Sequence, residues 1–235
     1  RADAPLVAGP VTRRGTVAWR TLTDPRSGVA MPRLVAHPDA AAMARANAAL
    51  DALRRREIGS AFACAAELAA GGAIAGTTPL VPDRDNQFTY TIVHVDARLL
   101  TLQQAGSVFC GGAHPANVWT VTMLDLVHGR VVTGDDLVRP SRRGALARLV
   151  LQRLHGRRRP GAPDEGADCS LFVDDERGRP QLVEYVRWAV IDGRFSVIQT
   201  DHPHAMSPCN DRYGTIPRTA LRDIVHSWVL GSLRR

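Results

Sequence analysis

The chain has 235 residues, of which 45% are hydrophobic and 23% are charged. This composition is typical of a globular protein and excludes a mainly disordered one. No apolar run approaches the roughly 20 residues that a membrane-spanning helix needs, so no membrane span is predicted. The formal net charge is +7, and all 30 basic residues are arginine.

The arginine content has two explanations. Guanidinium groups suit phosphate and carboxylate, so a basic face could bind phospholipid, lipopolysaccharide, nucleic acid or an acidic protein. The other explanation is a codon bias toward Arg and Ala in a GC-rich genome. We favour the codon bias because the arginines are mostly scattered along the chain. Aromatic residues, at 5%, are too sparse for a base-stacking surface, so no nucleic-acid partner is expected.

The four cysteines are widely spaced and form no C-x-x-C pair, which argues against a zinc ribbon or a thioredoxin-like motif. We predict two structural disulfides rather than buried free thiols. Of the three pairings, we favour Cys64 with Cys110 and Cys169 with Cys209, because each joins neighbouring segments. Disulfides indicate a periplasmic or secreted protein. A first residue other than Met fits a mature form after signal-peptide removal, or a shortened chain.

The first half of the chain alternates strand and helix patterns. Residues 1–14 read as an irregular leader. The following segments read as a strand at 15–23, an edge strand at 29–36 with Pro32, a helix from Pro38 to about Arg56, a second helix at 60–70, and strands at 87–95 and 99–109. Alternating residues from Val118 to Leu126 predict the next strand, so the strands from residue 87 onward form an antiparallel meander.

The second half begins with a helix near Ser141, whose apolar face includes Leu146 and Leu154. Strands are expected at 171–173 and 182–191, and Asp192-Gly193 predicts a tight hairpin with the strand at 195–198. A loop leads to a last helix that starts around Pro217. The predicted fold is α+β, an antiparallel sheet of about six to eight strands with three or four helices packed on it.

The most distinctive motif is the glycine corner Gly111-Gly112-Ala113-His114-Pro115. An imidazole on such a corner can reach a ligand. A purely structural histidine, hydrogen-bonded to a neighbouring carbonyl, is the favoured alternative for His114. Asp201, His202 and His204 form the densest run of metal-binding residue types, yet nothing in the sequence brings them to His114.

Signatures of common enzymes are missing: we find no G-x-S-x-G elbow, Walker loop, H-E-x-x-H helix or Rossmann glycine pattern. No cofactor and no catalytic residue are therefore predicted.

The segment from Tyr90 to Leu137 resembles the bacterial domain of unknown function 3298, found in RsiV-type anti-sigma factors and PdaC-type peptidoglycan deacetylases. The family's order of features is a strand, a G-G-A-H corner, a strand into D-x-x-T/H-G, and D-L. Here these match Leu99–Gln103, Gly111–His114, Asp125–Gly129 and Asp136-Leu137.

The resemblance covers roughly residues 90–235, and its final part matches Ser207 to Leu221. Residues 1–89 resemble the companion N-terminal region, in which Asn47 matches a helical asparagine. RsiV-like proteins imply lysozyme binding and PdaC-like ones an envelope location. The resemblance carries no catalytic residue onto this chain.

The sequence thus predicts an extracytoplasmic, non-enzymatic protein that binds a cell-envelope component, such as peptidoglycan, or an envelope-acting protein such as lysozyme. The expected binding surface combines the corner residues Gly111, Gly112 and His114 with Asp201, His202 and His204. The alternative is a periplasmic hydrolase that uses His114 with His202 or His204, with or without zinc.

Overall fold

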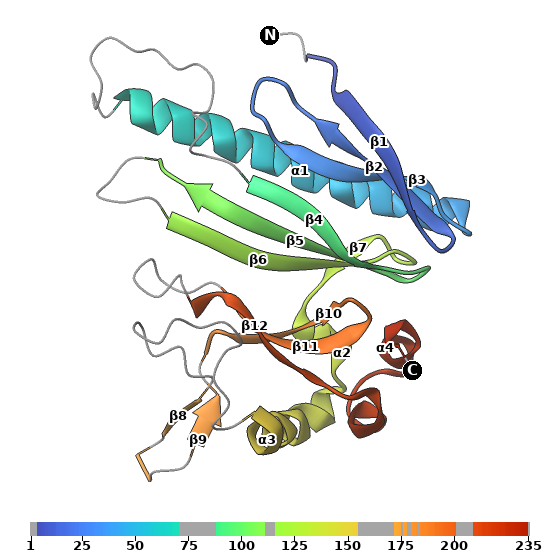
Figure 1. Cartoon of the computed structure of the whole chain (residues 1–235), viewed down its shortest axis with the longest axis vertical. Helices are drawn as coiled ribbons and strands as arrows, with labels where there is room; N and C mark the ends of the chain where they lie inside the picture. Colours follow the sequence, from blue (N-terminus) through green and yellow to red (C-terminus); the bar gives the residue numbers. More distant parts are fainter. Residues whose placement is uncertain are drawn as a thin grey trace. The chain divides into compact units, whose positions relative to one another are not determined.

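A computed structural model describes residues 4–70, 88–110, 116–154, 172–174, 176–177, 180–182, 184–200 and 209–234. Figure 1 labels its helices and strands. In chain order they are β1 (Val7–Arg14), β2 (Val17–Thr23), β3 (Ala30–Ala36), α1 (Ala40–Ala70), β4 (Phe88–Val95), β5 (Leu99–Val108), β6 (Ala116–Asp125), β7 (Arg130–Val132), α2 (Gly134–Leu137), η1 (Pro140–Arg142), α3 (Arg143–Leu154), β8 (Phe172–Asp174), β9 (Pro180–Leu182), β10 (Val186–Ile191), β11 (Arg194–Gln199), β12 (Asp211–Ile216), η3 (Arg218–Leu221) and α4 (Ser227–Ser232).

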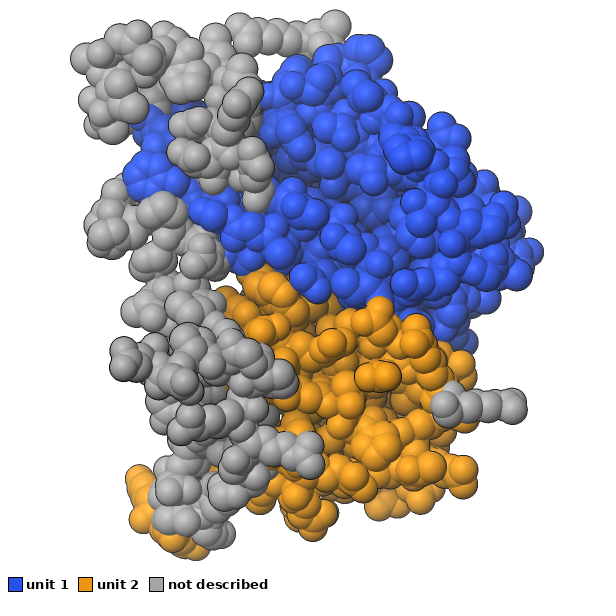
Figure 2. Space-filling view, in the orientation of Figure 1, with its two compact units in different colours: residues 1–118, 124–131 blue, residues 119–123, 132–235 orange. Residues whose placement is uncertain are grey.

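The described strands form four sheets, in the orders β1-β2-β3, β4-β5-β6-β7, β8-β9 and β10-β11-β12. The chain divides into two compact units, coloured blue and orange in Figure 2. Unit 1 comprises residues 1–118 and 124–131, and unit 2 comprises residues 119–123 and 132–235. The sequence predicts an N-terminal strand-and-helix region at 1–89 and a family-like region at 90–235 that together form one continuous unit, and this stays a prediction.

The α+β class is confirmed. The strands are distributed over several small sheets, and they outnumber the six to eight that the sequence predicts because short segments join sheets through backbone pairing.

The N-terminal segment differs from the predicted irregular leader, because β1 is a strand paired antiparallel with β2. Nearly every residue of β1 is exposed, so buried and exposed positions do not alternate along this strand. Gly15, with φ of 58°, makes the tight turn into β2. The strand is held by backbone pairing rather than by burial, which sequence patterning does not detect.

Helix α1 is one element of 31 residues, whereas the sequence predicted two helices with a break near Gly59. Asp39 begins it: the Asp39 carboxylate accepts a hydrogen bond from the backbone N–H of Ala42, at 3.0 Å. Glycine inside a helix costs only about 1 kcal/mol. Burial of Leu50 and Leu53 before the glycine and of Cys64 after it offsets that cost.

The core of unit 1 joins α1 to strands from both of its sheets. It consists of buried apolar side chains: Val17, Val29, Met31, Leu34, Ala46, Leu50, Leu53, Val95, Leu100, Leu102, Leu124 and Leu126. The core therefore contains residues of β2 and β3, which precede α1 in the chain, and of β4, β5 and β6, which follow it. It fixes β4 and β5 against α1.

Asn47 attaches α1 to the edge of β3. Its side-chain oxygen accepts a hydrogen bond from the Leu34 N–H at 2.8 Å, and its side-chain nitrogen donates to the Leu34 carbonyl at 3.0 Å. Because β3 is the last strand of its sheet, the Asn47 amide occupies the position that a further strand would take.

In unit 2 the Asp192-Gly193 hairpin is confirmed. Both residues have positive φ, 51° and 68°, as a two-residue turn of this type requires. The hairpin joins β10 to β11, which also pairs with β12. Strand β12 replaces part of a predicted loop, because its residues pair with β11, the preceding strand of the hairpin.

Two predicted elements of unit 2 are divided in the structure. The strand expected at 182–191 becomes β9 and β10, and the helix expected from Pro217 becomes η3 and α4. The isolated bridge between Val138 and Val225 accounts for the second break, because it draws the chain between η3 and α4 into extended pairing.

Candidate functional site

The predicted binding residues lie outside the residues that the structure describes. These are Gly111, Gly112 and His114 at the glycine corner, and Asp201, His202 and His204 in the second segment. That they take part in binding stays a prediction. The described residues do define how the chain enters the first segment and leaves the second.

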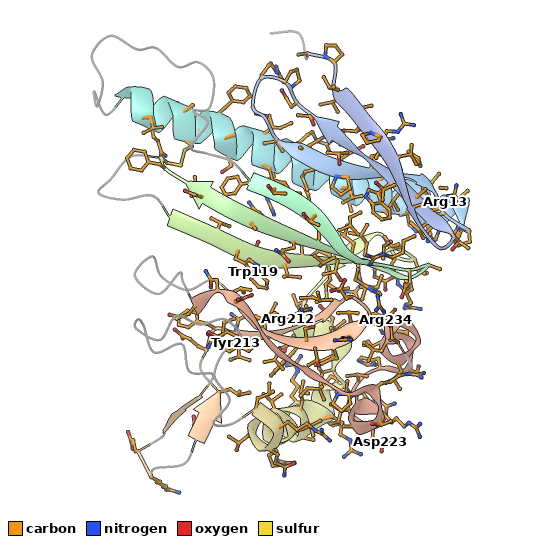
Figure 3. All side chains as sticks on the ribbon, viewed as in Figure 1. Arg13, Trp119, Arg212, Tyr213, Asp223 and Arg234 are labelled. Carbon is orange, nitrogen blue, oxygen red and sulfur yellow. A yellow bond between two sulfur atoms is a disulfide. The ribbon has the colours of Figure 1, made fainter. Side chains whose placement is uncertain are left out.

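A disulfide bond adjoins each of the two segments. Cys64 and Cys110 are bonded, as predicted, with 4.6 Å between their Cα atoms; Figure 3 draws the side chains. Cys209 is also disulfide-bonded, and Cys169, its predicted partner, lies outside the described residues. Cys110 directly precedes the glycine corner, and Cys209 directly follows residues 201–208. The chain is therefore covalently anchored at one end of each histidine-bearing segment.

A second contact fixes the strands that lead to the corner. The Tyr90 hydroxyl on β4 donates a hydrogen bond to the Glu57 carboxylate on α1 at 2.9 Å. Burial and the neighbouring Glu57 charge raise the pKa of Tyr90 above its usual value. The phenol therefore stays a neutral donor, and α1 holds β4 through Glu57 and the end of β5 through Cys64.

The described histidine and carboxylate of the family-like motif meet in the turn between β6 and β7. The Asp125 carboxylate is buried, and it accepts a hydrogen bond from Nδ1 of His128 at 2.7 Å. It also accepts bonds from the backbone N–H groups of Val127 at 3.0 Å and His128 at 3.3 Å. The Arg98 guanidinium lies 3.5 Å from the same carboxylate.

Opposing effects act on the pKa of Asp125. Burial alone would raise it, but the hydrogen bonds from the His128 side chain and backbone, together with the Arg98 charge, outweigh burial and lower the pKa. The ionised carboxylate requires the His128 ring to carry its proton on Nδ1. Nε2 is the other ring nitrogen, on a side chain that is 57% exposed.

Gly129 explains why this turn packs against α1. Its φ is 64°, and a Cβ added there would lie 2.4 Å from Cβ of Arg45. Only glycine fits both the backbone conformation and the space. Arg45 in turn donates from Nε to the Val127 carbonyl at 2.8 Å.

The sequence motif Asp125–Gly129 did not predict the Asp125–His128 pair. The available signal was the spacing of three residues after a strand, which lets an aspartate bind both the backbone and the side chain of the following turn. Arg45, 82 residues from Val127, had no local signal.

Within the described ranges, no group of three or more His, Cys, Asp or Glu residues could hold a metal ion. The Asp125–His128 pair presents the Nε2 side of the imidazole ring on an exposed side chain. None of the helices in these ranges has the length and apolar character needed to cross a membrane.

Comparison with solved structures finds a crystal structure of a DUF3298 family protein from Pseudomonas aeruginosa PAO1. The match covers 97% of this chain and 97% of that chain, with a TM-score of 0.41 and 15% sequence identity. No model of a known protein family matches the chain, and no curated protein matches it. The family of the solved structure is the one that residues 90–235 resemble in sequence.

Proposed function

We propose that this is an extracytoplasmic, non-enzymatic protein that binds a cell-envelope component, or an envelope-acting protein such as lysozyme. Its binding surface includes the corner Gly111–Pro115 and the segment with Asp201, His202 and His204. The family resemblance supplies the class of partner.

The observation that carries this proposal is the position of the disulfides. The Cys64–Cys110 bond and the bonded Cys209 each adjoin one of the two segments. A disulfide limits the conformations of the chain beside it, which lowers the entropy lost when that chain binds a partner. Disulfides persist in the periplasm and outside the cell, which supports the proposed location.

The test is retention of the purified protein on peptidoglycan sacculi, with and without lysozyme. We expect wild-type protein to be retained in at least one of the two conditions. Gly112→Val and His114→Ala should each lower retention about tenfold, as expected for the loss of a central contact. His226→Ala is the matched control, because His226 lies outside both proposed binding segments and its side chain makes no capping hydrogen bond to α4.

Two results would contradict the proposal. Equal retention of the folded corner variants and the wild type would exclude the corner from the binding surface. The zinc hydrolase would instead be identified if the purified protein contained stoichiometric zinc and hydrolysed a peptidoglycan or ester substrate, and if His114→Ala lost both the zinc and the hydrolysis.

A further inference from the structure

The positive charge of this chain is concentrated in one stretch. Residues 137–163 contain eight arginines and no acidic residue, while the rest of the chain has 22 arginines against 23 acidic residues. Thus the net charge of +7 comes from this stretch. A codon bias explains arginine in place of lysine, but it does not explain the absence of Asp and Glu here.

The described part of this stretch is η1 with α3. The helix is attached to unit 2 by its buried side chains Leu146, Val150 and Leu154. Leu154 contacts β12 closely: a Cβ added to Gly214 would lie 2.9 Å from Cδ2 of Leu154. The chain entering η1 is fixed as well, because the Arg139 N–H donates to the Ile224 carbonyl.

The arginines occupy the solvent side of this anchored element. Arg142, Arg143, Arg148 and Arg153 are all exposed. Arg143 lies 3.5 Å from Asp135, with both side chains more than half exposed. Among the described residues, the side chains of the other three make no ion pair or hydrogen bond, so their charges are not neutralised locally.

The position of two arginines is unfavourable for the helix itself. Arg142 and Arg143 lie at the start of α3, whose first turn has no acidic residue. The helix dipole disfavours cations at this end, typically by about 0.3–1 kcal/mol each. Stability of the isolated fold therefore does not account for these residues, whereas an anionic partner at this surface does.

We propose that the exposed face of η1 and α3 binds the anionic headgroup surface of a phospholipid membrane. Guanidinium groups match phosphate oxygens in charge and geometry. Leu149 and Leu151 are half-buried beside the arginines, and such apolar side chains suit the boundary between headgroups and acyl chains. They do not suit a nucleic-acid backbone, and α3 has no aromatic side chain on which a base could stack. The choice of lipid rests partly on the proposed extracytoplasmic location.

Vesicle flotation tests this surface with the purified full chain. One vesicle contains phosphatidylcholine alone and the other equal parts of phosphatidylcholine and phosphatidylglycerol. The test variant is Arg142→Gln/Arg148→Gln/Arg153→Gln. The matched control, Arg187→Gln/Arg194→Gln/Arg222→Gln, removes the same charge from exposed arginines elsewhere in unit 2. All six side chains are exposed, and Arg187 also donates hydrogen bonds to the Glu184 and Val186 carbonyls. The test variant should keep the wild-type unfolding midpoint, and the control should change it only slightly.

We expect wild-type protein to float only with the phosphatidylglycerol vesicles, and to be released by added salt. Each arginine near an anionic surface contributes about fivefold in affinity, so the test variant should bind about 100-fold more weakly. The control should lose no more than about fivefold.

Three results would overturn the proposal: no preference of the wild type for phosphatidylglycerol, equal losses in the two variants, or tighter binding to duplex DNA at the same salt. The sacculus experiment uses no lipid and the flotation no peptidoglycan or lysozyme. A negative result in the flotation experiment therefore does not affect the proposed peptidoglycan or lysozyme binding, and a negative result with sacculi does not affect the proposed lipid binding.

Discussion

Asp125 is the residue on which the β6–β7 turn depends. Its buried carboxylate accepts bonds from the His128 side chain and from the backbone N–H groups of Val127 and His128. Asp125→Ala leaves these donors without their acceptor and should lower the free energy of unfolding by about 3 kcal/mol. Chemical denaturation measures this loss, and Asp223→Ala, at an exposed residue labelled in Figure 3, should change stability by less than about 0.5 kcal/mol.

The same carboxylate makes stability depend on pH in a defined direction. The pKa of Asp125 is lower in the folded state than its ordinary value of 3.8. Its contribution is therefore fully present above that ordinary value, and it is lost as the pH falls through the folded pKa. The stability difference between wild type and Asp125→Ala should be constant at neutral pH and shrink below about pH 4. A difference that grows on acidification would contradict this assignment.

At the scale of elements, the docking of α1 on β3 depends on one amide. Asn47 satisfies both backbone groups of Leu34, at 2.8 Å and 3.0 Å, and Asn47→Ala leaves both unpaired in a buried position. We expect a loss of about 2 kcal/mol in the free energy of unfolding.

Asn47→Asp provides the matched comparison, because it keeps the acceptor for the Leu34 N–H but removes the donor to the Leu34 carbonyl. Thermal unfolding should separate the two contacts. If Asn47→Ala unfolds at the wild-type midpoint, the edge of β3 does not depend on this residue.

At the scale of the whole molecule, all four cysteines should be oxidised, since the structure has no free cysteine among the described residues. Peptide mapping without reduction should recover Cys64 linked to Cys110, and Cys169 linked to Cys209. The first bond spans 46 residues, so replacing both of its cysteines by serine should cost about 4 kcal/mol in the chain-entropy model. Ser60→Ala, at an exposed position of the same helix, is the control. A titratable thiol in the unfolded, unreduced protein would contradict the mapping.

Local chemistry determined the parts of the fold that the sequence predicted. The Asp192-Gly193 turn and strands β2, β3, β4 and β5 follow from turn residues and from period-two patterns within a few residues. The Cys64–Cys110 pair followed from the small number of cysteines and their neighbouring segments. These features depend on interactions between residues that are close in the sequence, or on a choice among three pairings.

Tertiary structure alone decided the rest. Strand β1 exists because β2 offers it a backbone partner, and α1 continues through Gly59 because side chains on both sides of the glycine are buried. The site around Asp125 likewise needs Arg45 from α1, which meets Val127 only in the folded chain. Pairing of an exposed strand such as β1 and burial between distant residues leave no periodic pattern in the sequence, so these features could not be predicted from it.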